Sequence, residues 1–388
     1  MKTTLGQIVV AEGIKTGPFG SQLHASEYSP SGVGVVMPQD IRDNALSFEA
    51  MAHITNERAH ELSGFALAPG DIVQSRRGDI SRRAIVHADN PPLICGTGCL
   101  RIRIDNDLAH PRFVFYLLAT AESSSWLLRH SVGATMPNLN ASILGKLPVE
   151  LPPLNEQQAI AEVLGALDDR IAANKAVVEL CDQLRHTYWK QLTTKATTEQ
   201  PLSELAQFVN GRAFTKNADG KGRMVVRIAE LNTGPGASTV YSSIDAPENH
   251  TVSAGELLMS WSGSLRTARW FRDDAIVNQH IFKVIPTAPD TEWAVESAID
   301  TLMPTFRSIA ADKATTMGHI KREHLDFKVR WPRLTGGQQA LGASVWRRAL
   351  QAEVENEVLA RTRDELLPLL MNGTITVREA EDRTKEVP

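Results

Sequence analysis

The chain has 388 residues, with 42% apolar and 22% charged residues, which is enough for two or three ordinary globular domains. Its formal net charge of −4 argues against a uniformly basic nucleic-acid-binding protein, so any DNA binding must use local basic faces or a partner subunit. Three cysteines do not make a disulfide framework, no apolar run reaches membrane-spanning length, and the N-terminal segment shows no signal-peptide pattern. We therefore expect a protein of the reducing cytoplasm.

Residues 1–150 predict a first unit of short strands and loops. Alternating apolar residues over 100–104 predict a half-buried strand, and residues 111–129 predict a helix. The segment Gly70–Ser75 reads as a turn leading into another strand. A cluster of arginines follows it directly: Arg76, Arg77, Arg82 and Arg83.

Residues 151–196 predict one long helix. Two prolines precede Asn155, a candidate N-cap, and Gln158 stands where a capping box requires Glu or Gln. Roughly 38 residues would make a rod of roughly 55 Å. The 4–3 spacing of a coiled-coil stripe continues through Ile160, Leu164, Leu167, Ile171, Asn174 and Val178. Two interpretations of Asn174 remain open, because a buried asparagine can fix helix register or can simply face solvent at the helix edge.

The same plan recurs about 181 residues further on. Residues 197–332 predict a second unit, in which Gly255–Ser260 parallels Gly70–Ser75 and a second basic cluster, with Arg272 at its end, follows. Residues 333–377 predict a second long helix with a weaker stripe that includes Leu341, Val345, Leu359 and Leu366. We expect an α+β fold of two pseudo-equivalent units, with the helices paired as an antiparallel coiled coil and a charged, disordered tail at 378–388.

Motifs of catalysis and metal binding are missing from the sequence. It contains no phosphate or dinucleotide loop, no zinc-protease motif and no nucleophile elbow. Cys95 and Cys99 lack further ligands at zinc spacing. Asn90-Pro91-Pro92-Leu93 is similar to the loop of adenine methyltransferases, but Leu93 stands where an aromatic residue must stack on the base, so we interpret it as a turn.

The basic clusters are the strongest functional signal. Arginine can pair with guanine or hold a phosphate, and polar loop residues near the clusters can assist. The alternative is a solvated loop with salt bridges. The candidate DNA-binding residues are Lys15, Ser21, Gln22, Gln39, Arg76, Arg77, Arg82, Arg83, Asn138, Asn140, Arg212, Lys216, Arg266, Arg269, Asn278, Gln279, Lys313, His319 and Lys321.

In combination and order, these segments resemble the specificity (S) subunit of a type I DNA restriction-modification system. The resemblance covers nearly the whole chain. It is carried by Ile14–Tyr28 (IKTGPFGSQLHASEY), Gly70–Gly78 (GDIVQSRRG), Leu151–Lys175 (LPPLNEQQAIAEVLGALDDRIAANK), Asn278–Val284 (NQHIFKV) and Arg361–Val377 (RTRDELLPLLMNGTITV). The second helix departs from the family pattern at Gly336-Gly337, which affects its expected start.

The resemblance implies that target-recognition domains at 1–150 and 197–332 each read one half of a bipartite double-stranded DNA target. The helices would set the gap and dock two methyltransferase (M) subunits, which use S-adenosylmethionine. Restriction (R) subunits, which use ATP and Mg, would cleave unmodified DNA in defence against phage. The chain itself would hold no cofactor and no catalytic residue. Two alternatives are a self-sufficient methyltransferase or nuclease, and a DNA-recognition or protein-scaffold subunit of a related defence or orphan methyltransferase complex.

Overall fold

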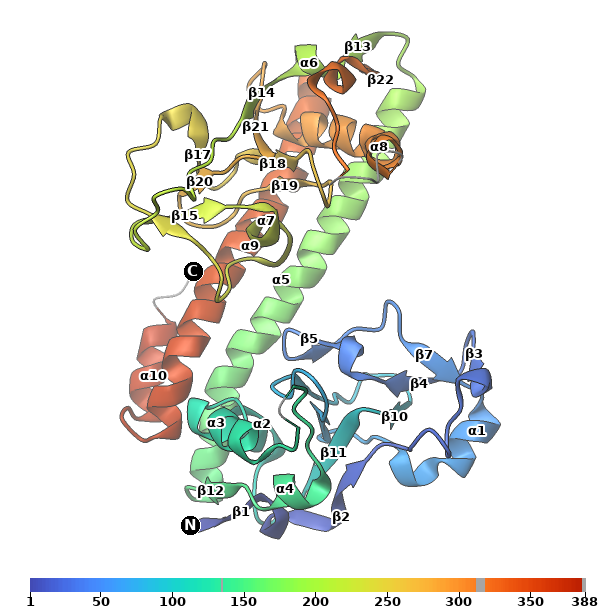
Figure 1. The fold of residues 1–388 in the computed structure, drawn as a ribbon, viewed down its shortest axis with the longest axis vertical. Helices are drawn as coiled ribbons and strands as arrows, with labels where there is room; N and C mark the ends of the chain where they lie inside the picture. The colour runs from blue at the N-terminus through green and yellow to red at the C-terminus, as the bar shows by residue number, and fades with distance from the viewer. Residues whose placement is uncertain (134, 312–317, 386–388) are drawn as a thin grey trace. The chain divides into compact units, whose positions relative to one another are not determined.

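The computed structural model describes residues 1–133, 135–311 and 318–385, which form two compact units (Figure 1). Unit 1 consists of Met1–Asp168 and Arg361–Pro388, and unit 2 consists of Asp169–Ala360. In sequence, unit 2 is thus an insertion between two parts of unit 1. Each long helix contributes residues to both units.

Unit 1 is built on two four-stranded sheets. An antiparallel sheet has the order β2 (Val9–Thr16), β11 (Cys99–Ile104), β8 (Ile72–Ser75), β9 (Arg83–Ile85). The other has the order β10 (Leu93–Cys95), β4 (Val33–Val36), β7 (Ala52–Ile54), β3 (Tyr28–Ser29), and its β10–β4 pair is parallel. Two short pairs are β1 (Lys2–Thr4) with β12 (Pro148–Glu150) and β5 (Ile41–Arg42) with β6 (Ala45–Leu46).

The helices of unit 1 are short, apart from the ends of the two long ones. They are α1 (Asn56–Glu61), α2 (Pro111–Leu117), α3 (Ala121–His130), α4 (Ala141–Gly145) and α10 (Val377–Thr384). The helix predicted over 111–129 is therefore two helices. The division falls before Thr120, whose hydroxyl accepts a hydrogen bond from the Ser123 amide at 3.2 Å and so starts α3 as an N-cap.

Unit 2 repeats this topology. Its antiparallel sheet has the order β14 (Ala206–Asn210), β21 (Ile281–Pro286), β18 (Leu257–Ser260), β19 (Thr267–Arg269). Its mixed sheet has the order β16 (Tyr241–Ser242), β15 (Arg223–Val226), β20 (Ala275–Val277), β17 (Thr251–Val252), with β15 and β20 parallel. The remaining elements are β13 (Glu199–Pro201), which pairs with β22 (Lys328–Arg330), and α6 (Leu202–Leu205), α7 (Ile228–Thr233) and α8 (Glu292–Ala311). The antiparallel sheets of the two units have the same strand order, and both mixed sheets contain the corresponding parallel pair, β10–β4 and β20–β15, which confirms the predicted duplication.

The two long helices, α5 (Leu154–Thr194) and α9 (Gly336–Met371), pair antiparallel. Within unit 2, Arg170 contacts Glu355 at 2.7 Å and Tyr188 donates to the Gln338 carbonyl at 3.4 Å. Within unit 1, Arg363 contacts Asp168 at 2.7 Å. The contacts descend along one helix as they ascend along the other, so the predicted α+β fold with an antiparallel helix pair is confirmed.

Most of the predicted stripe faces inward. Ile160, Leu164, Leu167, Asn174, Leu359 and Leu366 are buried, and Ile171, Val178 and Val345 are half-buried. Leu341 is 49% exposed, so its predicted place in the helix interface is wrong. At this end α9 instead turns Gly342, Trp346 and Ala349 inward, because only a glycine at 342 leaves room for the indole of Trp293.

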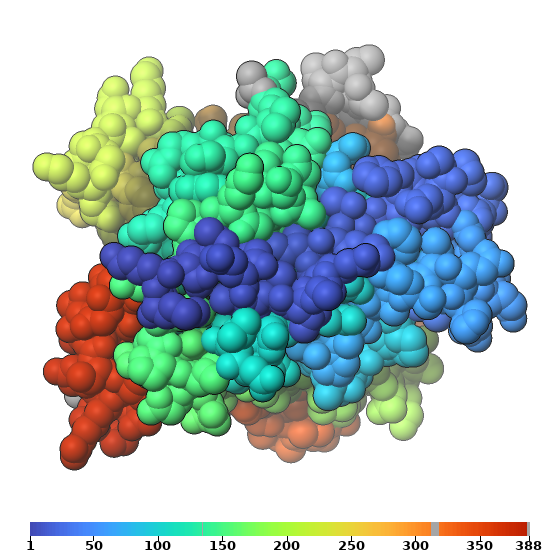
Figure 2. Space-filling view, turned by 90° about the horizontal axis from the view of Figure 1, so that it is seen from below, coloured from blue at the N-terminus to red at the C-terminus, as the bar shows by residue number. Residues whose placement is uncertain are grey.

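The predicted disordered tail is also wrong for residues 378–384, which lie in α10 (Val377–Thr384). Thr376 and Glu379 form a reciprocal capping box, and Ala380 is buried, so a good N-terminal cap and one apolar contact hold this short helix. Figure 2 shows dark-blue residues from the start of the chain crossing the surface of unit 1. Among the residues described, no helix is long and apolar enough to cross a membrane.

Candidate nucleic-acid interface

A small backbone frame encloses the end of β8 in unit 1. The Arg76 amide donates to the Gly98 carbonyl at 2.8 Å, and the Arg76 carbonyl accepts from the Leu139 amide at 2.8 Å. The Gly78 amide donates to Pro137 at 3.2 Å, and Gly78 and Gly98 have φ of 69° and 92°, which glycine adopts without strain. This frame brings Arg76, Arg77 and Asn138 together from segments 60 residues apart.

Unit 2 has the same frame at the end of β18. The Trp261 amide donates to the His280 carbonyl at 3.0 Å, and its carbonyl accepts from Ile320 at 2.9 Å. The Gly263 amide donates to Gly318 at 2.9 Å. Bridges join Arg77 to Asn138 in unit 1 and Ser262 to His319 in unit 2. Trp261 therefore occupies the position of Arg76, and His319 that of Asn138.

This correspondence corrects the predicted match of the two basic clusters. The Ser75 amide donates to the Arg82 carbonyl, and the Ser260 amide donates to the Arg266 carbonyl, so Arg82 and Arg266 are equivalent. Strand register instead places Arg269 opposite Leu257, where unit 1 has Ile85 opposite Ile72. Arg76, Arg77 and Arg83 have no arginine at the corresponding positions of unit 2. The clusters are alike in the sequence because they follow equivalent strands, but their side chains are not repeated.

Arg76 is a buried cation without a buried counter-ion. It is 8% exposed, and no carboxylate ion-pairs with it among the residues described. Its Nε and Nη2 approach only the Asn138 amide oxygen, each at 3.4 Å, and its guanidinium lies 5.7 Å from the centre of the Phe19 ring. Burial, and then the charge of Arg77, lower the pKa of Arg76. Such a group has unused donors and a desolvation cost that an incoming acceptor would offset.

Arg83 has a different environment, although it is equally buried. Its Nη1 and Nε donate to the carbonyls of Ser81 at 2.9 Å and Phe115 at 3.2 Å, and its guanidinium lies over the Phe115 ring. Burial lowers the pKa of Arg83 to about 10. Its 7% exposure and its bonds to backbone indicate a structural residue, contrary to the predicted DNA contact.

Two candidates of unit 2 are likewise structural. Arg269 is 5% exposed and contacts Asp182 at 2.8 Å and Glu353 at 2.6 Å. Burial alone would lower the pKa of Arg269, but the hydrogen bonds to Asp182 and Glu353 and the charge of Glu296 raise it. Asn278 is 5% exposed, and its side-chain oxygen accepts from the Phe214 amide at 3.1 Å. Neither side chain is available to DNA in this structure.

The remaining candidates lie on or near the surface. The exposed ones are Ser21, Gln22, Gln39, Arg77, Arg82, Asn140, Arg212, Lys216, Gln279 and Lys321, and the half-buried ones are Lys15, Asn138, Arg266 and His319. Asn140 caps α4 by accepting from the Ile143 amide at 2.8 Å. The backbone amide of Gln279 donates to the backbone carbonyl of Arg212 at 2.9 Å. Lys313 lies outside the described residues.

Phe19 and Trp261 at the frames, and His280 beside Trp261, were missed. Phe19 is 52% exposed beside Arg76, and half-buried Trp261 lies 4.9 Å from the ring of His280 and 6.4 Å from that of His319. The indole nitrogen of Trp261 donates to Asn210 at 2.8 Å. The sequence offered a signal for Phe19, because an aromatic residue inside the glycine-rich segment 17–20 is unusual. It offered no signal for Trp261, whose neighbours in sequence do not distinguish it from a core residue.

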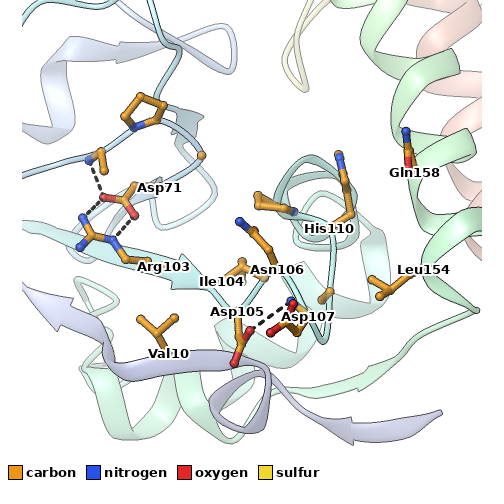
Figure 3. Close-up of a pocket in the computed structure, with 15 residues that line it drawn as sticks. Val10, Asp71, Arg103, Ile104, Asp105, Asn106, Asp107, His110, Leu154 and Gln158 are labelled. Atoms are coloured by element: carbon orange, nitrogen blue, oxygen red, sulfur yellow. Dashed lines mark hydrogen bonds and ion pairs between the residues drawn. The ribbon is translucent and has the colours of Figure 1, made fainter.

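The opposite end of β8 borders a cavity of about 790 Å³ in unit 1 (Figure 3). Asp71, just before β8, binds Arg103 through contacts of 2.7 and 2.6 Å, and the loop that carries Asp105 and Asp107 lines the other side. Burial lowers the pKa of His110, another lining residue. Because three carboxylates and only one arginine line it, this cavity is unsuited to phosphate, and the basic end of the sheet is the one at Arg76.

Comparisons with known proteins find similarity to DNA specificity proteins. Residues 38–179 match the family model described as a type I restriction modification DNA specificity domain. A putative type I restriction enzyme MjaX specificity subunit of Methanocaldococcus jannaschii is 23% identical over 174 residues, which are 43% of this chain and 40% of the relative. The MjaIX specificity subunit of the same organism is 29% identical over 160 residues, 41% of this chain and 36% of the relative. The matches thus span about two fifths of these relatives.

The fold has a solved counterpart over its whole length. The crystal structure of a type I restriction-modification S subunit from M. genitalium superposes with a TM-score of 0.59 and covers 95% of each chain at 16% identity. The chain therefore shares with that S subunit its fold of α+β units and long helices. The resemblance predicted from the sequence, to the specificity (S) subunits of type I restriction-modification systems, is confirmed.

Proposed function

We propose that this chain is the sequence-reading subunit of a type I restriction-modification complex in the cytoplasm, in which unit 1 and unit 2 each read one half of a split DNA target. The observation that carries this proposal is the repeated backbone frame, which ends equivalent strands in both units and carries Arg76 in one and Trp261 in the other. A duplicated reader fits a target with two halves. Double-stranded DNA is therefore the expected ligand.

We further propose that the chain is not an enzyme and that its partners supply the chemistry. Two M subunits would transfer methyl groups from S-adenosylmethionine to adenine, and R subunits would use ATP and Mg to cleave. In unit 2, α5 exposes Leu180 by 64% and Leu184 by 52%, four residues apart on one face. Exposed leucines at helical spacing favour a partner helix packed on that face. We propose this face as part of the docking surface for an M subunit.

The decisive experiment is a comparison of adenine methylation in cells that express an M subunit of the same genome with and without this chain. We expect a split motif with a fixed gap that appears only with the chain. A methylation pattern that is the same in both strains would contradict the proposal. Purified chain that binds S-adenosylmethionine and methylates DNA without a partner would instead favour the enzyme alternative.

The role of the helices as a spacer has its own test. Because α5 and α9 are antiparallel partners, seven residues are inserted into both, after Leu167 and after Ala360. Seven helical residues add about 10 Å, or about three base pairs of duplex. We expect the methylated motif to keep both halves and to gain about three base pairs between them. A motif whose gap stays unchanged would exclude the spacer role.

A further inference from the structure

We propose that Arg76 reads a guanine in the first half-site, held in place by Asn138 and Phe19, and that Trp261 fills the same position of the frame in unit 2 and reads by ring contact. The two half-sites would then be distinguished by different chemistry at one shared backbone position. This inference rests on the proposed function and adds to it the residues that read the bases and the kind of base that one of them selects.

The first step is the set of donors that Arg76 leaves unused. A guanidinium has five N–H donors, and those of Arg76 reach only one amide oxygen, at 3.4 Å. Buried Arg101, by contrast, donates to the carbonyls of Gly64, Ala66 and Glu12 at 3.2–3.3 Å, and Arg103 binds Asp71 with two contacts. Arg76 is therefore the buried arginine whose site, within the residues described, provides neither a carboxylate nor a carbonyl acceptor for its side chain.

The second step is the geometry around that guanidinium. Phe19 covers it at 5.7 Å, and the frame fixes the backbone of Arg76 through Gly98 and Leu139. A planar cation held against an aromatic ring keeps its orientation. Guanine presents two acceptors, O6 and N7, on its major-groove edge. These two acceptors match the fork of an arginine better than the edge of any other base does. The same fork can bind two oxygens of a phosphate, and a change in the methylated motif distinguishes a base contact from a phosphate contact.

The third step is the contrast with unit 2. Trp261 has a single donor, and that donor already binds Asn210 at 2.8 Å. Its ring, next to His280 and His319, can make apolar and stacking contacts and cannot form a forked pair. The thymine methyl group is the apolar feature of the major groove. Nδ1 of His280, beside the ring, is buried and lacks a hydrogen-bond partner among the described residues.

The experiment measures methylated motifs in cells that express the full chain, or its variants, with the M subunit. We expect Arg76→Gln to lower the preference for guanine at one position of the first half-site by about ten- to a hundredfold, and to leave the second half-site unchanged. Trp261→Leu should change the second half-site alone. The charge-matched control is Arg129→Gln, which removes an exposed arginine from α3 and should leave the motif as it is.

Phe19→Ala is a second variant that tests the same inference without disturbing the fold. Phe19 is exposed, and its replacement removes the ring that covers Arg76. We expect it to weaken the same guanine preference as Arg76→Gln, to a smaller degree. Uniformly reduced methylation with an unchanged motif in both variants would overturn base reading by Arg76. If the unmodified chain directs a split motif and the variants leave it intact, only this inference fails; if the unmodified chain directs no motif, the proposed function fails with it.

Discussion

Arg269 and Asp182 form a two-pronged ion pair inside unit 2, with Nη1–Oδ1 and Nη2–Oδ2 distances of 2.8 and 2.9 Å. Arg269 lies on β19 and Asp182 on α5, and the same guanidinium reaches Glu353 on α9 at 2.6 Å. Nearby, Arg185 contacts Asp300 at 3.0 Å, and buried Glu296 accepts from the indole of Trp346 at 2.6 Å. Buried charges thus tie the sheet of unit 2 to both long helices.

Arg269→Met should destabilise unit 2 by about 2–3 kcal/mol, because it leaves the half-buried carboxylates of Asp182 and Glu353 without their cation. Six of the seven tryptophans of the chain lie in unit 2, so denaturation followed by tryptophan fluorescence measures this unit. Arg347→Met is the matched control, since it breaks the exposed pair with Asp290 and should cost less than about 1 kcal/mol. Equal effects of the two variants would contradict the structural role of Arg269.

Gly342→Ala should destabilise unit 2 by about 1–3 kcal/mol, because the added methyl group would overlap the buried indole of Trp293. Gly337→Ala, on the same helix with open space around it, should be neutral or stabilise by up to about 1 kcal/mol. The two midpoints of chemical denaturation give the comparison. A stable Gly342→Ala variant would mean that α9 does not pack against α8 as closely as this structure has it.

His186 should make unit 2 more stable in acid than in alkali. The hydrogen bond with Asp300, at 3.2 Å, raises the pKa of His186 above its ordinary value of 6.5. A raised histidine pKa contributes stability that is complete below pH 6.5 and disappears as the pH rises through the folded-state pKa. The effect should be small, since the side chain is 54% exposed. We expect the melting temperature to fall over this range, and His186→Gln, unlike His87→Gln, to remove that fall.

Replacement of Leu180 and Leu184 by glutamate should weaken binding of the M subunit at least tenfold, because charged side chains would be desolvated in an apolar contact. The matched control, Gln183→Glu with Thr187→Glu, adds the same charge to a neighbouring face of α5. Titration of each purified variant with the M subunit measures the two affinities. Unaltered affinity of the leucine variant would place the docking surface elsewhere.

The repeated architecture could be predicted because it depends on local sequence patterns. The stripe of α5 follows helical spacing, and equivalent turns such as Gly70 and Gly255, with φ of 89° and 97°, mark the same strand in each unit. The error at Leu341 has a tertiary cause. Near the start of α9 the buried stripe lies one residue further along the chain than predicted, because Trp293, almost 50 residues earlier, fills the space beside Gly342.

The candidate site was harder to predict, because an arginine's neighbours in sequence do not identify its partners. Asp182 and Glu353 lie 87 and 84 residues from Arg269, so a buried ion pair looked like a basic loop. Arg76 and Arg83 are seven residues apart and equally buried, but backbone carbonyls accept hydrogen bonds from the side chain of Arg83 and not from that of Arg76. Only the folded chain distinguishes them.

The division of the chain also has a consequence for the order of synthesis. All residues of unit 2 have been made once the ribosome reaches Ala360, whereas unit 1 still lacks the end of α9 and α10. We therefore expect the unit encoded second to be completed first. Until the last residues emerge, the nascent chain would expose the faces of unit 1 that Leu366, Leu370 and Ala380 later cover.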